Sequence, residues 1–303
     1  MKTAVKNSKG SIERETRKNE QGRGPLDGKK VFRNKGTCSR TFFYLLDREF
    51  KEVKDTEERA ADSLAGGIMQ KGYQCGMLWG SALAIGAEAY RRCENEEQAM
   101  RVAVKATQKV MASFEEREST INCREVTHCD FSSKWSFAKY FFSGRFLHCF
   151  NLAEQWAPDA VQAALEGLGS EERIIGQDKL TKGSIDHPCL NCASLVAHKL
   201  GASEEEKVIV AGFAGGLGLS GSGCGALSAA IWMRSLNWCR ENPKKSSFKN
   251  PEARKTIEDF ERFTDGEYLC SNLTGKTFKT FQEHSDYIRR KGCESLIQEL
   301  TLD

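Results

Sequence analysis

Apolar residues recur at helical spacing along most of this chain, and few segments alternate between apolar and polar positions as strands do. Apolar side chains at i, i+3 and i+4 predict amphipathic helices over residues 96–116, 157–168, 251–263 and 281–300. Four more predicted helices come in pairs, 57–69 with 204–213 and 75–90 with 224–239. The pattern predicts an all-α fold.

The helices predicted at 75–90 and 224–239 carry small residues on one face. In the first of them these are Gly76, Gly80 and Ala84. Small side chains let a neighbouring backbone approach closely, so we expect both helices to be tightly packed and central.

Four cysteines in the first half of the chain recur in the same order in the second half. The clearest match pairs Cys75-Gly76 with Cys224-Gly225, and in both copies a Gly-Gly pair ends eight residues before the cysteine. The full sets are Cys38, Cys75, Cys123 and Cys149, and Cys192, Cys224, Cys270 and Cys293. Successive spacings are 37, 48 and 26 residues in the first set, and 32, 46 and 23 in the second. This repeat predicts two tandem copies of a small helical-bundle domain with converging cysteines.

The repeat also sets the expected domain boundaries. The first copy spans residues 31–168, a linker covers 169–185, and the second copy spans 186–303. Residues 1–30 are polar and more basic than acidic, so we expect a disordered, solvated tail.

Charge and cysteine content bear on the compartment and the partners. The net charge of +3 is too small to indicate nucleic-acid binding. No apolar segment follows Met1, and twelve cysteines without a secretory signal predict a reducing, cytoplasmic environment. Residues 208–233 lack charged side chains, but their seven glycines and three serines favour a buried loop and helix over a membrane span. A homo-oligomer and a redox partner protein stay open.

The wide spacing within each set restricts the chemistry. It excludes the short C-x₂₋₄-C knuckles of zinc modules and the closely spaced ferredoxin run. It is compatible with an iron–sulfur cluster inside a helical bundle, or with redox-active dithiols, because thiolates suit soft metals and clusters. No general acid–base constellation stands out, so catalytic residues and enzyme activity stay open.

Cys75 and Cys224 each lie at the predicted start of a helix. Backbone N–H groups and the helix dipole there stabilise a thiolate, which would lower the cysteine pKa. We expect Gly76, Gly216 and Gly225 to bring backbone donors close to the sulfurs. Residues 216–221 also fit G-x-G-x-x-G, but without βαβ alternation this is a weak indication of a dinucleotide site.

The other cysteines, Cys93, Cys129, Cys189 and Cys239, have no counterpart in the opposite copy. Cys189 and Cys192 form a C-x-x-C in the second copy only, which leaves a redox pair open. We expect Cys93 and Cys239 to be packing residues.

The segments Asn191-Cys192-Ala193, Gly223-Cys224-Gly225-Ala226 and Leu269-Cys270, followed by Cys293, resemble the C_GCAxxG_C_C family of redox-active proteins. Met77 departs from the pattern in the first copy, where the second has Ala226. This family looks related to the iron–sulfur part of split-Soret cytochromes, and that resemblance implies a [2Fe–2S] cluster on four cysteines. The chain lacks the haem-binding motifs of those cytochromes, so only the iron–sulfur part carries over.

The leading hypothesis is therefore a cytoplasmic electron-transfer or redox-sensing protein that binds iron–sulfur clusters through its two sets of four cysteines. One alternative is a metal-free thiol–disulfide oxidoreductase that uses Cys224 with Cys192 or Cys270. Another is a module in which the cysteines bind zinc for structure.

Overall fold

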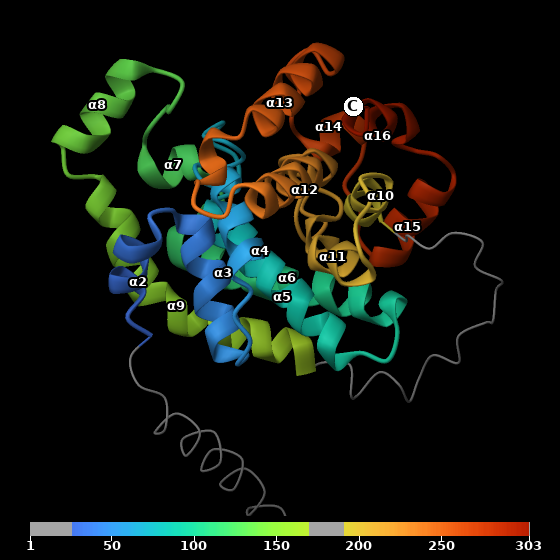
Figure 1. Cartoon of the computed structure of the whole chain (residues 1–303), viewed down its shortest axis with the longest axis horizontal. Helices are drawn as coiled ribbons and strands as arrows, with labels where there is room; N and C mark the ends of the chain where they lie inside the picture. Colours follow the sequence, from blue (N-terminus) through green and yellow to red (C-terminus); the bar gives the residue numbers. More distant parts are fainter. Residues whose placement is uncertain (1–25, 170–190, 303) are drawn as a thin grey trace, which may run out of the picture.

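The computed structural model describes residues 26–169 and 191–302, which form helices joined by short loops (Figure 1). The first half contains α2 (Gly28–Lys35), α3 (Cys38–Glu49), α4 (Asp55–Ala60), η1 (Ala61–Leu64), α5 (Gly76–Arg92), α6 (Glu96–Glu118), α7 (Cys123–Thr127), α8 (Lys134–Phe142) and α9 (Phe146–Leu168). The second half contains α10 (Cys192–Lys199), α11 (Glu204–Ile209), η3 (Ala211–Phe213), α12 (Gly225–Glu241), η4 (Ser247–Lys249), α13 (Pro251–Phe263), α14 (Cys270–Thr274), α15 (Phe281–Arg289) and α16 (Glu294–Leu300). The described residues contain two isolated β-bridges and no strands, which confirms the predicted all-α class.

The order of helices repeats between the halves. Helices α3, α5, α7 and α8 of the first half correspond in order to α10, α12, α14 and α15 of the second. The central pair, α5 and α12, are both seventeen residues long and both begin directly after a cysteine. The tandem arrangement of the cysteines is therefore also a tandem arrangement of structural elements.

Helix α5 lies at the centre of the molecule and is buried on every side from Gly76 to Ala89. A Cβ atom on Gly80 would lie 1.9 Å from the carbonyl oxygen of Ser39, so α3 and α5 can pack this closely only because residue 80 is glycine. A helix that is hydrophobic all round needs partners on all sides. Helices α3 and α6 of its own half and α11 of the other half supply them.

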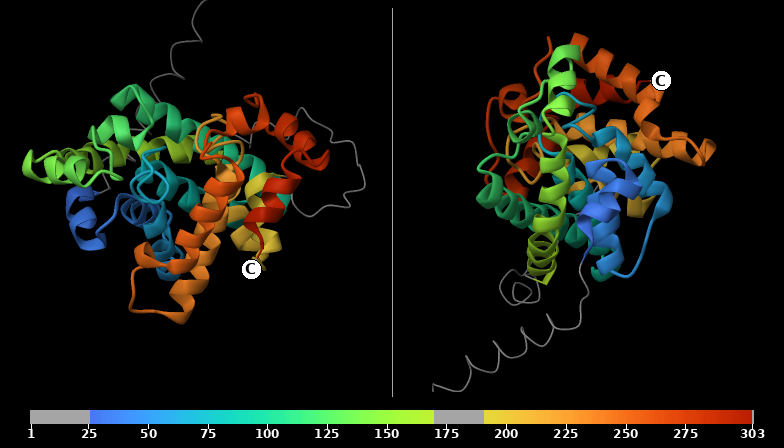
Figure 2. Two further views of the ribbon diagram at one scale, coloured as in Figure 1. Left: turned by 90° about the horizontal axis from the view of Figure 1, so that it is seen from above. Right: turned by 90° about the vertical axis from the view of Figure 1, so that its left-hand side faces the viewer.

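The two halves share one hydrophobic core. Their contacts are reciprocal, because α11 packs against α5 while α4 packs against α12. A Cβ on Gly86 of α5 would lie 2.4 Å from the carbonyl oxygen of Ile209 in α11. In Figures 1 and 2 the first half (blue to green) and the second (yellow to red) accordingly lie against each other, with α8 extending outward at one end.

Each half contains a run of five residues in the left-handed backbone conformation. Residues 66–70 and 215–219 all have φ between 45° and 85°. Three residues of the first run (Ile68, Met69 and Gln70) and two of the second (Leu217 and Leu219) are not glycine, although this conformation disfavours such residues. The surrounding core must hold these runs in place, and each leads to the cysteine that starts the central helix.

Several predicted boundaries are wrong. The helix expected over 281–300 is interrupted, because Lys291 adopts φ 63° and Cys293 caps a new helix, α16. The helix expected over 57–69 ends at Leu64, before the left-handed run. Helix α9 begins at Phe146 rather than at 157, and α2 already begins at Gly28, within the expected tail. Residues 1–25 and most of the expected linker lie outside the described residues.

None of the helices within 26–169 and 191–302 is long and apolar enough to cross a membrane. The uncharged stretch 208–233 is instead divided among α11, η3, the second left-handed run and α12.

Candidate functional site: two four-cysteine sites

The repeated cysteines lie at the starts of helices. Cys38, Cys123, Cys192 and Cys270 are the first residues of α3, α7, α10 and α14. Cys75, Cys224 and Cys293 are the N-caps of α5, α12 and α16, and Cys149 lies in the first turn of α9. We call Cys38, Cys75, Cys123 and Cys149 site 1, and Cys192, Cys224, Cys270 and Cys293 site 2.

An isolated β-bridge in each half places two cysteines side by side. In site 1 the backbone N–H of Cys75 donates to Ile121 O at 2.7 Å, and that of Cys123 donates to Tyr73 O at 2.6 Å. In site 2 the equivalent bonds run from Cys224 to Tyr268 O at 2.8 Å and from Cys270 to Ser222 O at 2.7 Å. The same backbone pairing therefore builds both sites.

The remaining cysteines of each set lie close enough to interact electrostatically with this pair. In site 1, negative charge on Cys123 or Cys149 raises the pKa of Cys75, while Cys38 is hydrogen bonded to Cys75. In site 2, negative charge on Cys224, Cys192 or Cys293 raises the pKa of Cys270. All four members of each predicted set thus lie within electrostatic range of one another.

Burial dominates the acidity of most of these thiols. It raises the pKa of Cys149 to about 11 and that of Cys224 to about 12. It also raises the pKa values of Cys123, Cys192, Cys270 and Cys293. The expectation of lowered pKa values for Cys75 and Cys224 is therefore wrong. In Cys75 the hydrogen bond to Cys38 is the main cause of the raised pKa, and burial adds to it. In Cys224 burial outweighs the stabilisation that the helix start gives to a thiolate.

Cys38 is the exception. Its hydrogen bond with Cys75 lowers its pKa to about 7 against the opposing effect of burial, and the backbone N–H groups of Gly66 and Ser39 assist. The side chain is half-buried, whereas its counterpart Cys192 is buried. The two sites therefore differ in their most acidic thiol, although the same backbone hydrogen bonds build both sites.

Backbone donors approach the sulfurs at a position that the sequence analysis did not single out. The N–H of Gly66 stabilises the Cys38 thiolate, and that of Gly215 stabilises the Cys192 thiolate. Both glycines begin a left-handed run, so the backbone conformation of this run directs the glycine N–H toward the sulfur in each half. The Gly-Gly pair before each central cysteine is the sequence feature from which these donors could have been predicted.

The three glycines predicted to approach the sulfurs have different surroundings. A Cβ on Gly76 would lie 2.4 Å from Cys38 Sγ, so this glycine borders site 1 directly. A Cβ on Gly216 would lie 3.0 Å from Cys270 Cβ. Gly225 instead packs against the carbonyl oxygen of Phe213, at 1.8 Å from such a Cβ, so its nearest neighbour is backbone and not a sulfur.

A tyrosine hydroxyl accompanies the last cysteine of each site. Tyr140 Oη lies 3.5 Å from Cys149 Sγ. The Tyr287 hydroxyl donates to Gly292 O at 2.9 Å, and it lies close enough to Cys293 for the two side chains to affect each other's pKa. Each tyrosine comes from the helix before its cysteine, α8 or α15. Tyr140 and Tyr287 precede their cysteines by nine and six residues, and this difference in spacing hid them from the sequence analysis.

The four thiols of each site match an iron–sulfur cluster in ligand type and number, and the structure supplies backbone N–H donors beside them. Their side chains do not, however, surround a common centre. Among residues 26–169 and 191–302, no group of three or more His, Cys, Asp or Glu side chains is placed to hold a metal ion. Ligation would require the thiols to lose their protons and turn inward.

The cysteines outside the two sets are dispersed. Cys129 is buried, accepts a hydrogen bond from Ser136 Oγ at 3.7 Å, and lies close enough to Cys123 to affect its pKa. Cys239 is buried within α12, and Cys93 caps the end of α5. Cys189, the other half of the C-x-x-C, lies outside the described residues.

A family model with the description "Putative redox-active protein (C_GCAxxG_C_C)" matches residues 37–161 and again residues 190–302. The chain belongs to this family. Each matched segment of the C_GCAxxG_C_C protein contains one complete site, so the family pattern occurs twice in tandem. A search of curated proteins and a search of solved structures gave no match.

Proposed function

We propose that each site binds an iron–sulfur cluster, with [2Fe–2S] favoured, and that the protein transfers electrons or senses redox state. The observation that supports the proposal is that four thiols from four separate segments lie close enough to affect one another's pKa, in both halves. A disulfide needs two cysteines, whereas a cluster of this kind takes four thiolates. When bound, such a cluster takes up and releases single electrons.

The residues around the thiols suit this role. The N–H groups of Gly66 and Gly215 point at sulfur, and donors of this kind stabilise thiolate ligands and tune the reduction potential. The hydroxyls of Tyr140 and Tyr287 add a second polar contact at the outer edge of each site. Because burial keeps most of the thiols protonated, cluster binding would release protons.

Anaerobic purification followed by iron, sulfide and zinc analysis tests the proposal. We expect about two irons and two sulfides per site, with visible absorption that bleaches on reduction. A colourless protein without iron would contradict it, and stoichiometric zinc without sulfide would favour a structural metal site.

The contact between Cys38 and Cys75 favours a second candidate, a metal-free dithiol in the first half. Oxidation would join the two sulfurs and transfer two electrons and two protons to an external disulfide. The half-buried Cys38 would be the attacking thiol. The pair expected from the sequence, Cys224 with Cys192 or Cys270, is less suited because burial raises the pKa values of all three.

Mass spectrometry separates the two candidates. The dithiol predicts a reversible loss of about 2 Da in metal-free protein, with Cys38 and Cys75 in one cross-linked peptide pair. Oxidation of the cluster-loaded protein would leave these cysteines uncrosslinked.

A further inference from the structure

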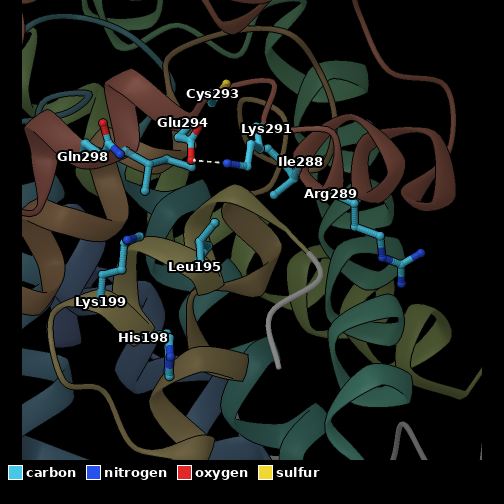
Figure 3. Close-up of a pocket in the computed structure, with 10 residues that line it drawn as sticks. Leu195, His198, Lys199, Ile288, Arg289, Lys291, Cys293, Glu294 and Gln298 are labelled. Carbon is cyan, nitrogen blue, oxygen red and sulfur yellow. Dashed lines mark ion pairs between the residues drawn. The ribbon is translucent and has the colours of Figure 1, made fainter. Parts of the chain in front are cut away.

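A pocket of about 410 Å³ opens beside site 2, between α10 and α16 (Figure 3). Its apolar surface comes from Leu195, Ile288 and Ile297. A volume of this size accommodates a small organic molecule, and apolar walls with a few polar groups are typical of ligand sites.

Cys293 lines this pocket, and it is the half-buried member of site 2. Cys192, Cys224 and Cys270 are buried. A molecule in the pocket would therefore lie beside the least buried cysteine of site 2.

The polar lining of the pocket is predominantly cationic. Lys199 at the end of α10 forms no ion pair with any described residue, and His198 lies next to it. Lys291 pairs with Glu294 at 3.1 Å, and Glu294 is the only acidic side chain among the described residues that line the pocket. Arg289 pairs with Asp286 at 3.5 Å and extends away from the other labelled side chains in Figure 3. Lys199 is thus the cation most available to a ligand.

We propose that this pocket binds a small organic anion with an apolar ring system beside site 2. The ring would lie on Leu195, Ile288 and Ile297, and the anionic group would face Lys199. This binding does not depend on the proposed function.

Anthraquinone-2-sulfonate is a suitable probe because it combines an apolar, redox-active ring system with one negative charge. We expect saturable binding at one site by titration calorimetry, and no binding of the dication methyl viologen. Lys199→Glu places a negative charge against the sulfonate and should weaken binding by about tenfold. Lys244→Glu makes the same charge change at an exposed position outside the pocket and should leave binding unchanged.

Leu195→Trp would fill the pocket and should abolish binding while circular dichroism shows retained helicity. If that variant does not fold, the affinity of Lys199→Glu alone tests whether the probe binds in this pocket. Absence of saturable binding, or equal affinities for wild type and Lys199→Glu, would overturn the proposal. Iron and sulfide analysis of the same preparation reports on the cluster separately. Absence of a cluster therefore does not imply absence of probe binding, and the reverse also holds.

Discussion

The side chain of Gln74 is hydrogen bonded to the backbone at Gly223, in the opposite half of the chain. Gly223 N–H donates to Gln74 Oε1 at 3.2 Å, and Gln74 Nε2 donates to Gly216 O at 2.8 Å. Gln74 directly precedes Cys75, and Gly223 directly precedes Cys224. One buried amide therefore ties the frame of site 1 to that of site 2.

Gln74 and Gly223 occupy equivalent positions in the two halves and face each other, and this contact explains why their residue types differ. A Cβ on Gly223 would lie 2.6 Å from Gln74 Oε1, so a larger residue in the second half would displace the amide that the first half supplies. The stacked rings of Tyr73 and Tyr268, with centroids 4.7 Å apart, continue this contact between the halves. The tandem copies are thus complementary at their interface.

Gln74→Ala should reduce the free energy of unfolding by about 1–3 kcal/mol, because it leaves the buried N–H of Gly223 without its partner and removes one of the donors to Gly216 O. Urea denaturation measures the change. Gln162→Ala, on the exposed face of α9, is the matched control and should change stability by less than about 0.5 kcal/mol. Equal stabilities of the two variants would show that the amide does not join the halves.

Gly76→Ala should disrupt site 1 while sparing site 2. The new Cβ would lie 2.4 Å from Cys38 Sγ, so the sulfur has to move. We expect loss of the iron bound at site 1, about half of the total. Gly169→Ala, where a Cβ meets nothing within 4 Å, should retain all of it. Full iron content in Gly76→Ala would mean that Cys38 is not a ligand.

Cys75→Ala should raise the pKa of Cys38 in metal-free protein, because the hydrogen bond from Cys75 is the main cause of its lowered value of about 7. The rate of Cys38 alkylation by iodoacetamide, followed by peptide mass spectrometry, should rise with pH through a midpoint near that value in the wild type. In the variant the midpoint should shift upward. An unchanged midpoint would assign the low pKa to the backbone donors instead.

Asp47→Asn should change how stability depends on pH. Asp47 is 1% exposed, and burial raises its pKa to about 8. The folded state therefore holds a proton that the unfolded state releases above about pH 4, so stability falls as pH rises toward 8. Asparagine does not ionise, so the stability of the Asp47→Asn variant lacks this dependence on pH.

Between pH 6 and 8 the wild type should lose up to about 2 kcal/mol more than Asp47→Asn, measured by urea denaturation. Asp55→Asn is the control, because the Asp55 side chain is 71% exposed and pairs with Arg59. Its pH profile should parallel that of the wild type. Parallel profiles for all three proteins would show that Asp47 is ionised in the folded state.

The sequence was sufficient to predict the all-α class and the two sets of cysteines, because duplication preserved the order of Cys38, Cys75, Cys123 and Cys149 while the spacing drifted. It also located the helix starts at Cys75 and Cys224, since small residues follow both at helical spacing. These features depend on local pattern, which a single sequence records. The ligand role of the cysteines stays a proposal.

Other parts of the sites depend on packing and could not be predicted in this way. The left-handed runs contain Ile68 and Leu217, which favour other conformations, so only the surrounding core explains them. The raised pKa of Cys224 reflects how much of the chain covers it rather than its position at a helix start. The break before Cys293 follows from a left-handed Lys291, a residue without a strong turn preference.

The central claim is that the chain has two independent four-cysteine sites, each with its own cluster. The most direct test is the iron content of Cys123→Ser, Cys270→Ser and the double variant after anaerobic purification. Each single variant should retain about half of the wild-type iron, and the double variant should retain none. Loss of all iron in either single variant would show one shared site, and full retention in both would show that these cysteines bind no cluster.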